Sequence, residues 1–220
     1  MSIEKQRTAT FRSDAFEVAT IEQAKQVTVT AELGTTTEER WEKETQYLTD
    51  DITRFLPISA ESCVLDYGSG LGRISKELIA RCGCRMIGVD ASKSMRQLSP
   101  EYVLSERFTV WSPEVLDTMI AQGFQADFAI SLWVIQHVFD AQEVIQRITR
   151  ALAAGGLFYT LNSNRRCVPT DHGWVHDGFD VQSHLRQTLV EEESHFLPPT
   201  VTTELLAKSC IVQVLRKLSK

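Results

Sequence analysis

Residues 64–72 read Val-Leu-Asp-Tyr-Gly-Ser-Gly-Leu-Gly, an apolar run that ends in an acid and is followed by three glycines at alternate positions. The run up to Asp66 is typical of a buried strand, and the apolar spacing from Ile74 to Ile79 predicts a helix. The glycines therefore occupy the turn between a strand and a helix. Glycine at such a turn permits unusual backbone angles and lets a ligand lie against the main chain, although packing alone can also favour it.

The spacing of the glycines separates two kinds of nucleotide site. A dinucleotide-binding turn has the pattern G-x-G-x-x-G, but here the third glycine position is Arg73 and the glycine comes one residue earlier. The pattern D-x-G-x-G-x-G closely resembles motif I of the class I S-adenosylmethionine (SAM) methyltransferases. SAM carries no pyrophosphate, and its ammonium group favours an acid nearby. The resemblance implies that the cofactor is SAM and that this turn binds it through Asp66, Gly68, Ser69, Gly70 and Gly72.

A second apolar run, residues 85–89, ends in another acid, Asp90. An acid at the tip of the second strand of a doubly wound sheet accepts hydrogen bonds from both ribose hydroxyls, in nicotinamide and SAM proteins alike. The residues that follow resemble the D-x-S-x-x-M continuation of the methyltransferases, which implies cofactor contacts from Ala91, Ser92 and Met95. The thioether of Met95 suits an aromatic face such as adenine, and a purely structural role in the core is the alternative.

The order of the later elements matches the same family from about residue 48 to residue 164. Residues 126–132 predict the fourth strand, and a helix is expected to run from its end to the two glycines at 155 and 156. Residues 157–161 predict the fifth strand, and the final strand is expected at 211–215. The resemblance implies an α/β fold, a Rossmann-like doubly wound seven-stranded sheet, mostly parallel with an antiparallel last strand and helices on both faces.

The third strand, predicted at residues 108–110, is followed by a departure from the family pattern. The family often has an Asp just after this strand, which accepts a hydrogen bond from the adenine amino group, whereas this chain has Ser112. Ser112 or a backbone carbonyl can take that role. The remaining expected cofactor contacts are therefore Ser112, Pro113 and Glu114, with Ser131 and Leu132 at the end of the fourth strand.

The first part of the chain, residues 1–56, is expected to form a helical cap on a core of residues 57–220. Thr36 and Glu39 form a T-x-x-E capping box that predicts the start of a helix, which Pro57 ends. In related methyltransferases such a helix covers the cofactor and shapes the acceptor pocket. Trp41 and Tyr47 would then line that pocket, unless Trp41 simply packs against the sheet.

Residues 164–180 predict an insertion on the acceptor side of the core. His172 and His176, with two aspartates beside them, could form a metal site, but the glycines between them disfavour the helix that their spacing would need. We therefore favour a substrate-side loop and predict no metal. The expected acceptor contacts are, besides Trp41 and Tyr47, Trp133, Gln136, Asn162, Arg165, His172 and His176.

His137 is the best candidate for a general base. It is expected at the start of the helix after the fourth strand, and an imidazole titrates near neutral pH. Three alternatives stay open: His137 only packs, His172 or His176 supplies the base, or an amine or carbon acceptor needs none.

Composition and motifs restrict the partners. The net charge of −6 argues against a large nucleic-acid surface, and the fourth strand ends without the N/D-P-P-Y/F motif of nucleobase methylation. No signal peptide or membrane span is evident, and the five cysteines contain no CxxC pair, so we expect a cytoplasmic enzyme. A small-molecule acceptor, bound by a monomer or a homodimer, is the expectation. A non-catalytic SAM-binding module and a nicotinamide-dependent oxidoreductase are the alternatives.

Overall fold

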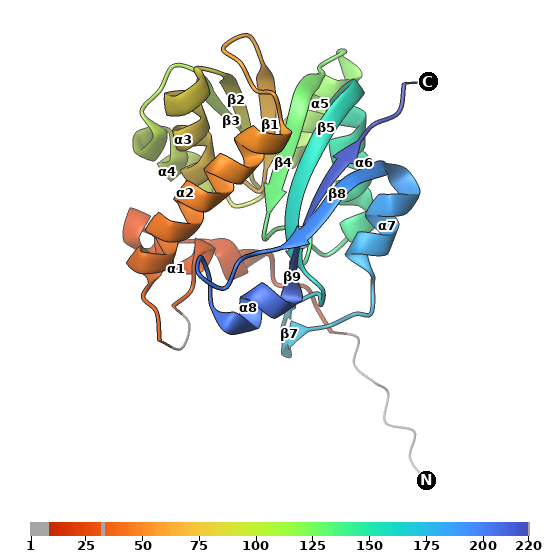
Figure 1. The fold of residues 1–220 in the computed structure, drawn as a ribbon. Helices are drawn as coiled ribbons and strands as arrows, with labels where there is room; N and C mark the ends of the chain where they lie inside the picture. The colour runs from red at the N-terminus through yellow and green to blue at the C-terminus, as the bar shows by residue number, and fades with distance from the viewer. Residues whose placement is uncertain (1–8, 32–33, 220) are drawn as a thin grey trace.

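The computed structural model describes residues 9–31 and 34–219 and contains a seven-stranded sheet with the strand order β3-β2-β1-β4-β5-β9-β8 (Figure 1). Strands β1 to β5 pair in parallel, whereas β9 is antiparallel to both β5 and β8. The predicted doubly wound sheet with an antiparallel last strand is therefore confirmed. The strands are β1 (Cys63–Tyr67), β2 (Arg85–Val89), β3 (Phe108–Trp111), β4 (Ala126–Leu132), β5 (Leu152–Ser163), β8 (Val190–Phe196) and β9 (Cys210–Arg216).

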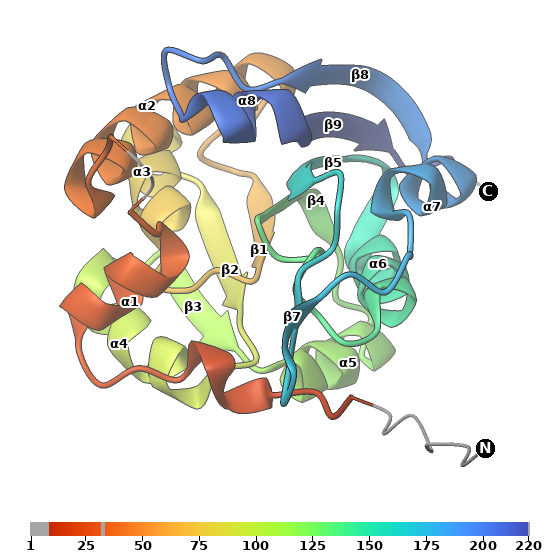
Figure 2. The ribbon, with the colours of Figure 1, turned by 90° about the horizontal axis from the view of Figure 1, so that it is seen from below.

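Helices cover both faces of this sheet (Figure 2). Alternate side chains of a strand point to opposite faces, so Val64 packs in the cluster under one helical layer and Leu65 in the cluster under the other. One layer contains α2 (Thr37–Phe55), α3 (Arg73–Cys82) and α4 (Lys93–Val103), and the other contains α5 (Pro113–Ala121), α6 (Ala141–Ala151) and α7 (Val181–Thr188). A short helix, α8 (Glu204–Ser209), precedes β9.

The amino-terminal segment crosses the carboxyl-end edge of the sheet, and we call residues 9–31 the strap. It contains a 3-10 helix, η1 (Ser13–Phe16), and the helix α1 (Ile21–Thr28). Its first residues pair with a hairpin of β6 (Val168–Thr170) and β7 (Gly173–Val175), through a bridge between Phe11 and Thr170. Arg12 N donates to Pro169 O at 3.0 Å. The predicted insertion at 164–180 thus contains a hairpin that the strap touches, while residues 1–8 of the predicted cap lie outside the described residues.

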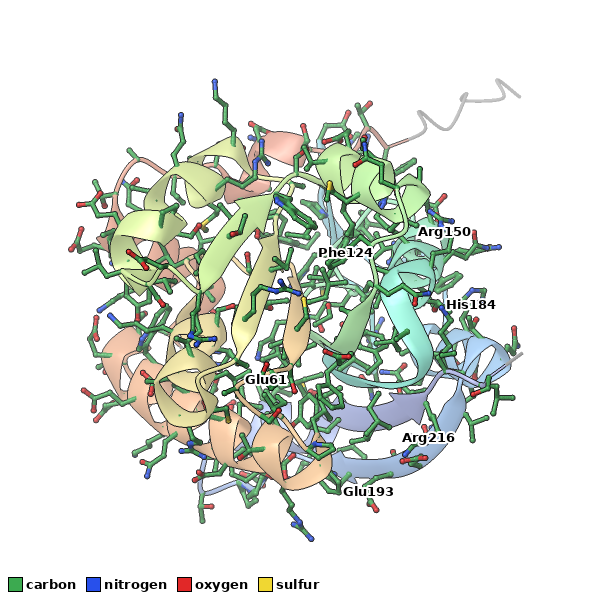
Figure 3. The ribbon with its side chains drawn as sticks, turned by 90° about the horizontal axis from the view of Figure 1, so that it is seen from above. Glu61, Phe124, Arg150, His184, Glu193 and Arg216 are labelled. Atoms are coloured by element: carbon green, nitrogen blue, oxygen red, sulfur yellow. The ribbon has the colours of Figure 1, made fainter. Side chains whose placement is uncertain are left out.

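The opposite end of the sheet is closed by loops (Figure 3). Glu61 and Phe124 lie in the loops that lead into β1 and β4. At the edge formed by β8 and β9, Arg216 makes an ion pair with Glu192. None of the helices in the described part of the chain is both long and apolar enough to cross a membrane.

Two predicted helix boundaries are wrong. The helix after β4 was expected to include His137, but residues 133–140 form turns, and α6 begins at Ala141 because the side chain of Asp140 caps it. The two glycines do not end this helix. It stops at Ala151, β5 begins at Leu152, and Gly155 lies inside the strand with its N–H bonded to the carbonyl of Lys217.

The predicted capping box is confirmed and yields a stability prediction. The Thr36 hydroxyl accepts from Glu39 N at 3.2 Å, and the Glu39 carboxylate accepts from Thr36 N at 3.0 Å. We expect Thr36→Ala to lower the free energy of unfolding by about 1 kcal/mol, because the N–H of Glu39 loses its acceptor and the Glu39 carboxylate loses the hydrogen bond from the hydroxyl. Urea denaturation measures this, with Glu42→Ala on the exposed side of the same helix as the control. Equal stability of the parent and Thr36→Ala would contradict it.

Candidate functional site

A cavity of about 360 Å³ lies at the carboxyl ends of β1, β2 and β4, beneath the strap. Parallel strands place the turns that follow them along one edge, which is where doubly wound sheets bind ligands. The walls are mostly apolar. The sequence-predicted site residues that line the cavity are Gly68, Gly70, Asp90, Ala91, Ser92, Met95, Pro113, Leu132, Trp133 and His137.

The glycine turn has little room for side chains. Gly68 has a φ of +78°, and a Cβ on it would lie 2.1 Å from a methyl carbon of Val134. Gly70 has a φ of +53°, and a Cβ there would meet the hydroxyl of Thr28 at 3.4 Å. The backbone at these positions therefore forms part of the cavity surface.

The carboxylate of Asp90 joins the turns that follow β1 and β2. One oxygen accepts from Gly70 N at 2.8 Å and the other from Ser92 N at 2.9 Å. Burial raises the pKa of Asp90, and the two N–H donors oppose that rise. Because each carboxylate oxygen has a second lone pair, Asp90 can still accept hydrogen bonds from two hydroxyl groups of a ligand.

Asp66 lies behind the glycine turn rather than on the cavity surface. Its carboxylate is buried and accepts from the hydroxyl of Ser75 at 2.7 Å. Burial raises the pKa of Asp66 to about 7, opposed by the Ser75 hydrogen bond, while the nearby charge of Asp90 raises it further. Asp66 therefore acts on any ligand through the turn and not by direct contact.

Only some of the residues that were expected to contact the adenine side of the cofactor line the cavity. Met95 lines the cavity and also packs in a core cluster with Leu71 and Trp41, so its two predicted roles are compatible. Ser112 is the cap of α5, where its hydroxyl accepts from Val115 N. The predicted contacts that do not line the cavity are Asp66, Ser69, Gly72, Ser112, Glu114 and Ser131; a Cβ on Gly72 would meet Val103, so packing also requires glycine there.

Most of the predicted acceptor contacts lie away from the cavity. Trp41 packs against Tyr102, with ring centroids 6.1 Å apart, and under the guanidinium of Arg73. Tyr47 lies against the core cluster between α2 and the sheet. The other five that lie outside the lining are Gln136 and Asn162, which bond to each other, and the exposed Arg165, His172 and His176.

The strap supplies lining residues that sequence reasoning did not place in the site. Phe11 and Phe16, two apolar residues in a polar segment of the sequence, line the cavity together with Thr28. Phe11 lies against Phe139, with ring centroids 5.5 Å apart. Only the pairing of the strap with the β6–β7 hairpin brings these rings to the cavity, and no local motif signals that pairing.

His137 lies between the strap and the hairpin. Its Nδ1 is 2.7 Å from the carbonyl oxygen of Cys167, which can only accept, so Nδ1 carries the proton. The other ring nitrogen, Nε2, then accepts from the side-chain amide of Gln136 at 2.9 Å. Burial lowers the pKa of His137, which keeps the imidazole neutral near pH 7. Its ring also contacts Phe16 and Trp174, at centroid distances of 5.7 and 5.4 Å.

The lining contains one guanidinium, that of Arg147, and it is already paired. It makes ion pairs with Asp117 at 2.9 Å and Glu143 at 2.6 Å, and it donates to the hydroxyl of Tyr67 at 3.2 Å. The hydrogen bond with Asp117 raises the pKa of Arg147, burial lowers it, and Tyr67 raises it further. Arg147 therefore adds little net positive charge to the cavity.

The residues considered for a metal do not converge. Asp177 makes an ion pair with Arg166 at 2.8 Å, and Asp171 accepts from Thr10 N at 2.8 Å. Across residues 9–31 and 34–219 no three acidic, histidine or cysteine side chains gather as metal ligands would. Instead of a loop without regular structure, this segment contains the β6–β7 hairpin, which pairs with the strap.

Comparison with known proteins identifies the family. Residues 40–199 match the model of a methyltransferase domain. The chain is similar to a ubiquinone biosynthesis O-methyltransferase of Methylobacterium sp. (strain 4-46), with 27% identity over 46% of this chain and 41% of the relative. It is also similar to phosphoethanolamine N-methyltransferase 2 of Caenorhabditis elegans, with 26% identity over 66% of this chain and 31% of the relative. The chain thus matches less than half the length of these relatives.

Solved structures share the fold. A putative sarcosine dimethylglycine methyltransferase from Galdieria sulphuraria superposes with a TM-score of 0.64 and 14% identity, over 84% of this chain and 89% of that one. A geranyl diphosphate C-methyltransferase from Streptomyces coelicolor A3(2) gives a TM-score of 0.60 and 14% identity, over 79% and 76%. At this identity the likeness concerns the fold alone.

The raised pKa of Asp66 makes stability depend on pH. The pKa of Asp66 is about 7 in the folded chain and about 4 in the unfolded chain, so the folded state holds the proton more tightly. The contribution of the protonated Asp66 to the free energy of unfolding is therefore lost as pH rises from about 4 to 7. Between pH 5 and pH 7.5 we expect the parent to lose about 2 to 3 kcal/mol relative to Asp66→Asn. Urea denaturation of both proteins at the two pH values measures this. A parallel change in both would contradict the buried, protonated acid.

Proposed function

The chain belongs to the methyltransferase domain family, and on this premise we propose that it transfers a methyl group from S-adenosylmethionine to a small-molecule acceptor. The observation that carries the proposal is the half-buried carboxylate of Asp90 beside the glycine turn, at the edge of a mostly apolar cavity. Two turns from neighbouring strands converge there through the Asp90–Gly70 hydrogen bond.

The residues present fit SAM. Gly68 and Gly70 expose backbone against which the methionine part can lie, and Asp90 has free lone pairs for the ribose hydroxyls. Met95 and Pro113 offer apolar surface to adenine. The carboxylate of Asp90 on the cavity wall, with the buried Asp66 behind the glycine turn, favours a ligand that brings positive charge, as the sulfonium and ammonium groups of SAM do.

SAM supplies a methyl group on a positively charged sulfur, which is already activated for displacement by a nucleophile. The chain has to align the acceptor with that methyl group and exclude water. Phe11 and Phe16 of the strap line the cavity together with Val138 and Phe139 of the β4–α6 turn, and the rings of Phe11 and Phe139 are in contact. We assign these residues to the acceptor side.

We propose His137 as the base when the acceptor is a hydroxyl. With Nδ1–H held by Cys167 O, Nε2 is the nitrogen that can take a proton, and its lowered pKa keeps it in the basic form. An acceptor hydroxyl would share or replace the Gln136 amide at Nε2.

A small acceptor is supported by the size of the cavity, about 360 Å³, and by the absence of the N/D-P-P-Y/F motif at the end of β4. Similar proteins also support it: one is named for ubiquinone biosynthesis, and another is named for phosphoethanolamine, which is a small molecule. The expectation of a cytoplasmic enzyme, monomeric or homodimeric, stays a prediction.

A non-catalytic SAM-binding module is the second candidate, and one observation favours it. The family often has an acid just after β3 that accepts a hydrogen bond from the adenine amino group, whereas this chain has Ser112. The hydroxyl of Ser112 already caps α5. Methyl transfer to any acceptor would exclude this candidate.

The experiment that tests the proposal is calorimetric titration with S-adenosylhomocysteine, SAM and NADH in parallel, followed by a screen of hydroxyl and amine acceptors. Binding of the first two without NADH, and then methyl transfer, is the expected result. Binding of NADH alone would overturn the assignment of the cofactor, and SAM binding without turnover on any acceptor would favour the non-catalytic module.

We expect Asp90→Ala and Gly70→Val each to weaken S-adenosylhomocysteine binding by at least about a hundredfold. The first removes the ribose acceptors, and the second places a branched side chain at a φ of +53° on the cavity surface. Gly123→Val is the matched control, because Gly123 has a φ of +94° with open space around it, far from the cavity lining. Calorimetry measures the three dissociation constants; parent-like affinity in either site variant would refute the placement of the cofactor.

We expect His137→Ala to retain S-adenosylhomocysteine affinity and to lower kcat for a hydroxyl acceptor by about a hundredfold or more. In the parent, kcat should fall on the acid side, at a pH below the ordinary imidazole pKa of 6.5, because protonation removes the base. That acid limb should be missing from the pH profile of the variant. An unchanged profile would leave His137 with a packing role between strap and hairpin.

A further inference from the structure

Trp133, the first residue after β4, has a backbone conformation that bulky residues rarely adopt. Its φ is +62°, and its N–H donates to Leu161 O at 2.8 Å, which prolongs the β4–β5 pairing by one residue. In the described part of the chain the other non-glycine residue with positive φ is Leu104, an exposed residue at the end of α4. A left-handed conformation is unfavourable for an L-residue because its Cβ lies too close to the following carbonyl oxygen, and such strain concentrates at functional sites.

The strained residue sets the shape of the cavity. Because the chain reverses at Trp133, the next side chain, Val134, lies directly against Gly68 of the glycine turn. Both residues of this reversal line the cavity. The strain at Trp133 therefore belongs to the wall that the proposed cofactor and acceptor share.

The indole of Trp133 has an unused donor. Its Nε1 is buried and has no hydrogen-bond partner in the structure. A buried indole N–H normally finds a partner, because an unsatisfied donor loses its bond to water without replacement. The indole is fixed in its packing against the core cluster near α2, so the donor cannot turn away as a hydroxyl can.

The other buried polar side-chain atoms without partners in the described residues lie away from the cavity wall. They are Glu44 Oε2, Ser69 Oγ, Arg73 Nη1, Ser99 Oγ and Ser131 Oγ, and none of these five residues lines the cavity. Within the described residues, Trp133 thus combines a rigid unpaired donor, a strained backbone and a place on the cavity wall.

We propose that Trp133 Nε1–H donates a hydrogen bond to an oxygen atom of a ligand in this cavity, and that this bond makes Trp133 a specificity-determining residue. An N–H donor requires a lone pair, so an ammonium group cannot be its partner. The oxygen belongs either to the carboxylate of the SAM methionine part or to the methyl acceptor. The inference rests on the proposed function and adds to it the chemical group that this wall of the cavity recognises, an oxygen atom with a free lone pair.

The test is a ¹H–¹⁵N NMR spectrum of the indole N–H signals of the full chain, which has four tryptophans. Trp133→Phe assigns the Trp133 signal by its absence. Three samples are compared: S-adenosylhomocysteine, 5′-methylthioadenosine, which lacks the amino-acid carboxylate, and S-adenosylhomocysteine together with catechol. A downfield shift of the Trp133 signal is expected on formation of the hydrogen bond.

The samples separate the two sources of the oxygen. A shift with S-adenosylhomocysteine but not with 5′-methylthioadenosine assigns the bond to the cofactor carboxylate, and a shift that requires catechol assigns it to the acceptor. In the first case Trp133→Phe should also weaken S-adenosylhomocysteine binding about tenfold by calorimetry. Trp111→Phe is the control, because Trp111 packs on Phe124 outside the cavity lining, and it should retain parent affinity.

Failure of this inference and failure of the proposed function give different results. Binding of S-adenosylhomocysteine with an unmoved Trp133 signal in all three samples overturns the role of Trp133 and leaves the proposed function intact. Absence of any binding overturns the proposed function itself. Thermal unfolding of Trp133→Phe identifies a loss of affinity that comes from a loss of folding, and the NMR shift of the parent protein does not depend on that variant being stable.

Discussion

The hydrogen bond between the carboxylate of Asp90 and the N–H of Gly70 is the interaction on which the site depends. β1 and β2 are parallel neighbours, so the turns after them end at the same edge, and this 2.8 Å bond ties one turn to the other. The second oxygen of Asp90 holds Ser92 N, at the start of α4. The same helix end receives Glu17 of the strap, whose carboxylate accepts from Lys93 N at 2.9 Å. Two carboxylates, those of Asp90 and Glu17, therefore connect the glycine turn, the start of α4 and the strap.

The electrostatics of this edge are shaped by burial. Asp66 is buried and Asp90 is half-buried, and their pKa values rise because the charged forms lose hydration. Hydroxyl and N–H donors from the adjoining turns offset part of that cost. Burial has the opposite effect on His137, whose pKa falls so that the ring stays neutral. An apolar cavity next to these acids and a neutral imidazole suits a cationic cofactor whose reaction needs little more than alignment and removal of a proton.

Three segments far apart in the sequence meet at His137. The ring bonds to the carbonyl of Cys167 ahead of the β6–β7 hairpin, and it contacts Phe16 of the strap and Trp174 of the hairpin. The β4–α6 turn, which contains His137 itself, is the third segment. Whatever its part in proton transfer, His137 holds together the side of the cavity that we assign to the acceptor. The packing of these three segments therefore depends on the same ring that we propose as the base.

The sequence by itself determined the sheet, the glycine turn, the acid Asp90 and the capping box, because each depends on local residue chemistry: apolar runs, positive-φ glycines and side-chain caps. It did not determine which side chains reach the cavity. Trp41 has the same helical spacing whether it lines a pocket or packs against Tyr102. Ser112 fits the sequence pattern of a ligand contact and that of a helix cap equally well. The arrival of Phe11 and Phe16 at the cavity and the reversal at Trp133 were decided by tertiary structure alone. They arise from contacts between distant segments, the strap with the hairpin and Val134 with Gly68, which leave no periodic signal along the chain.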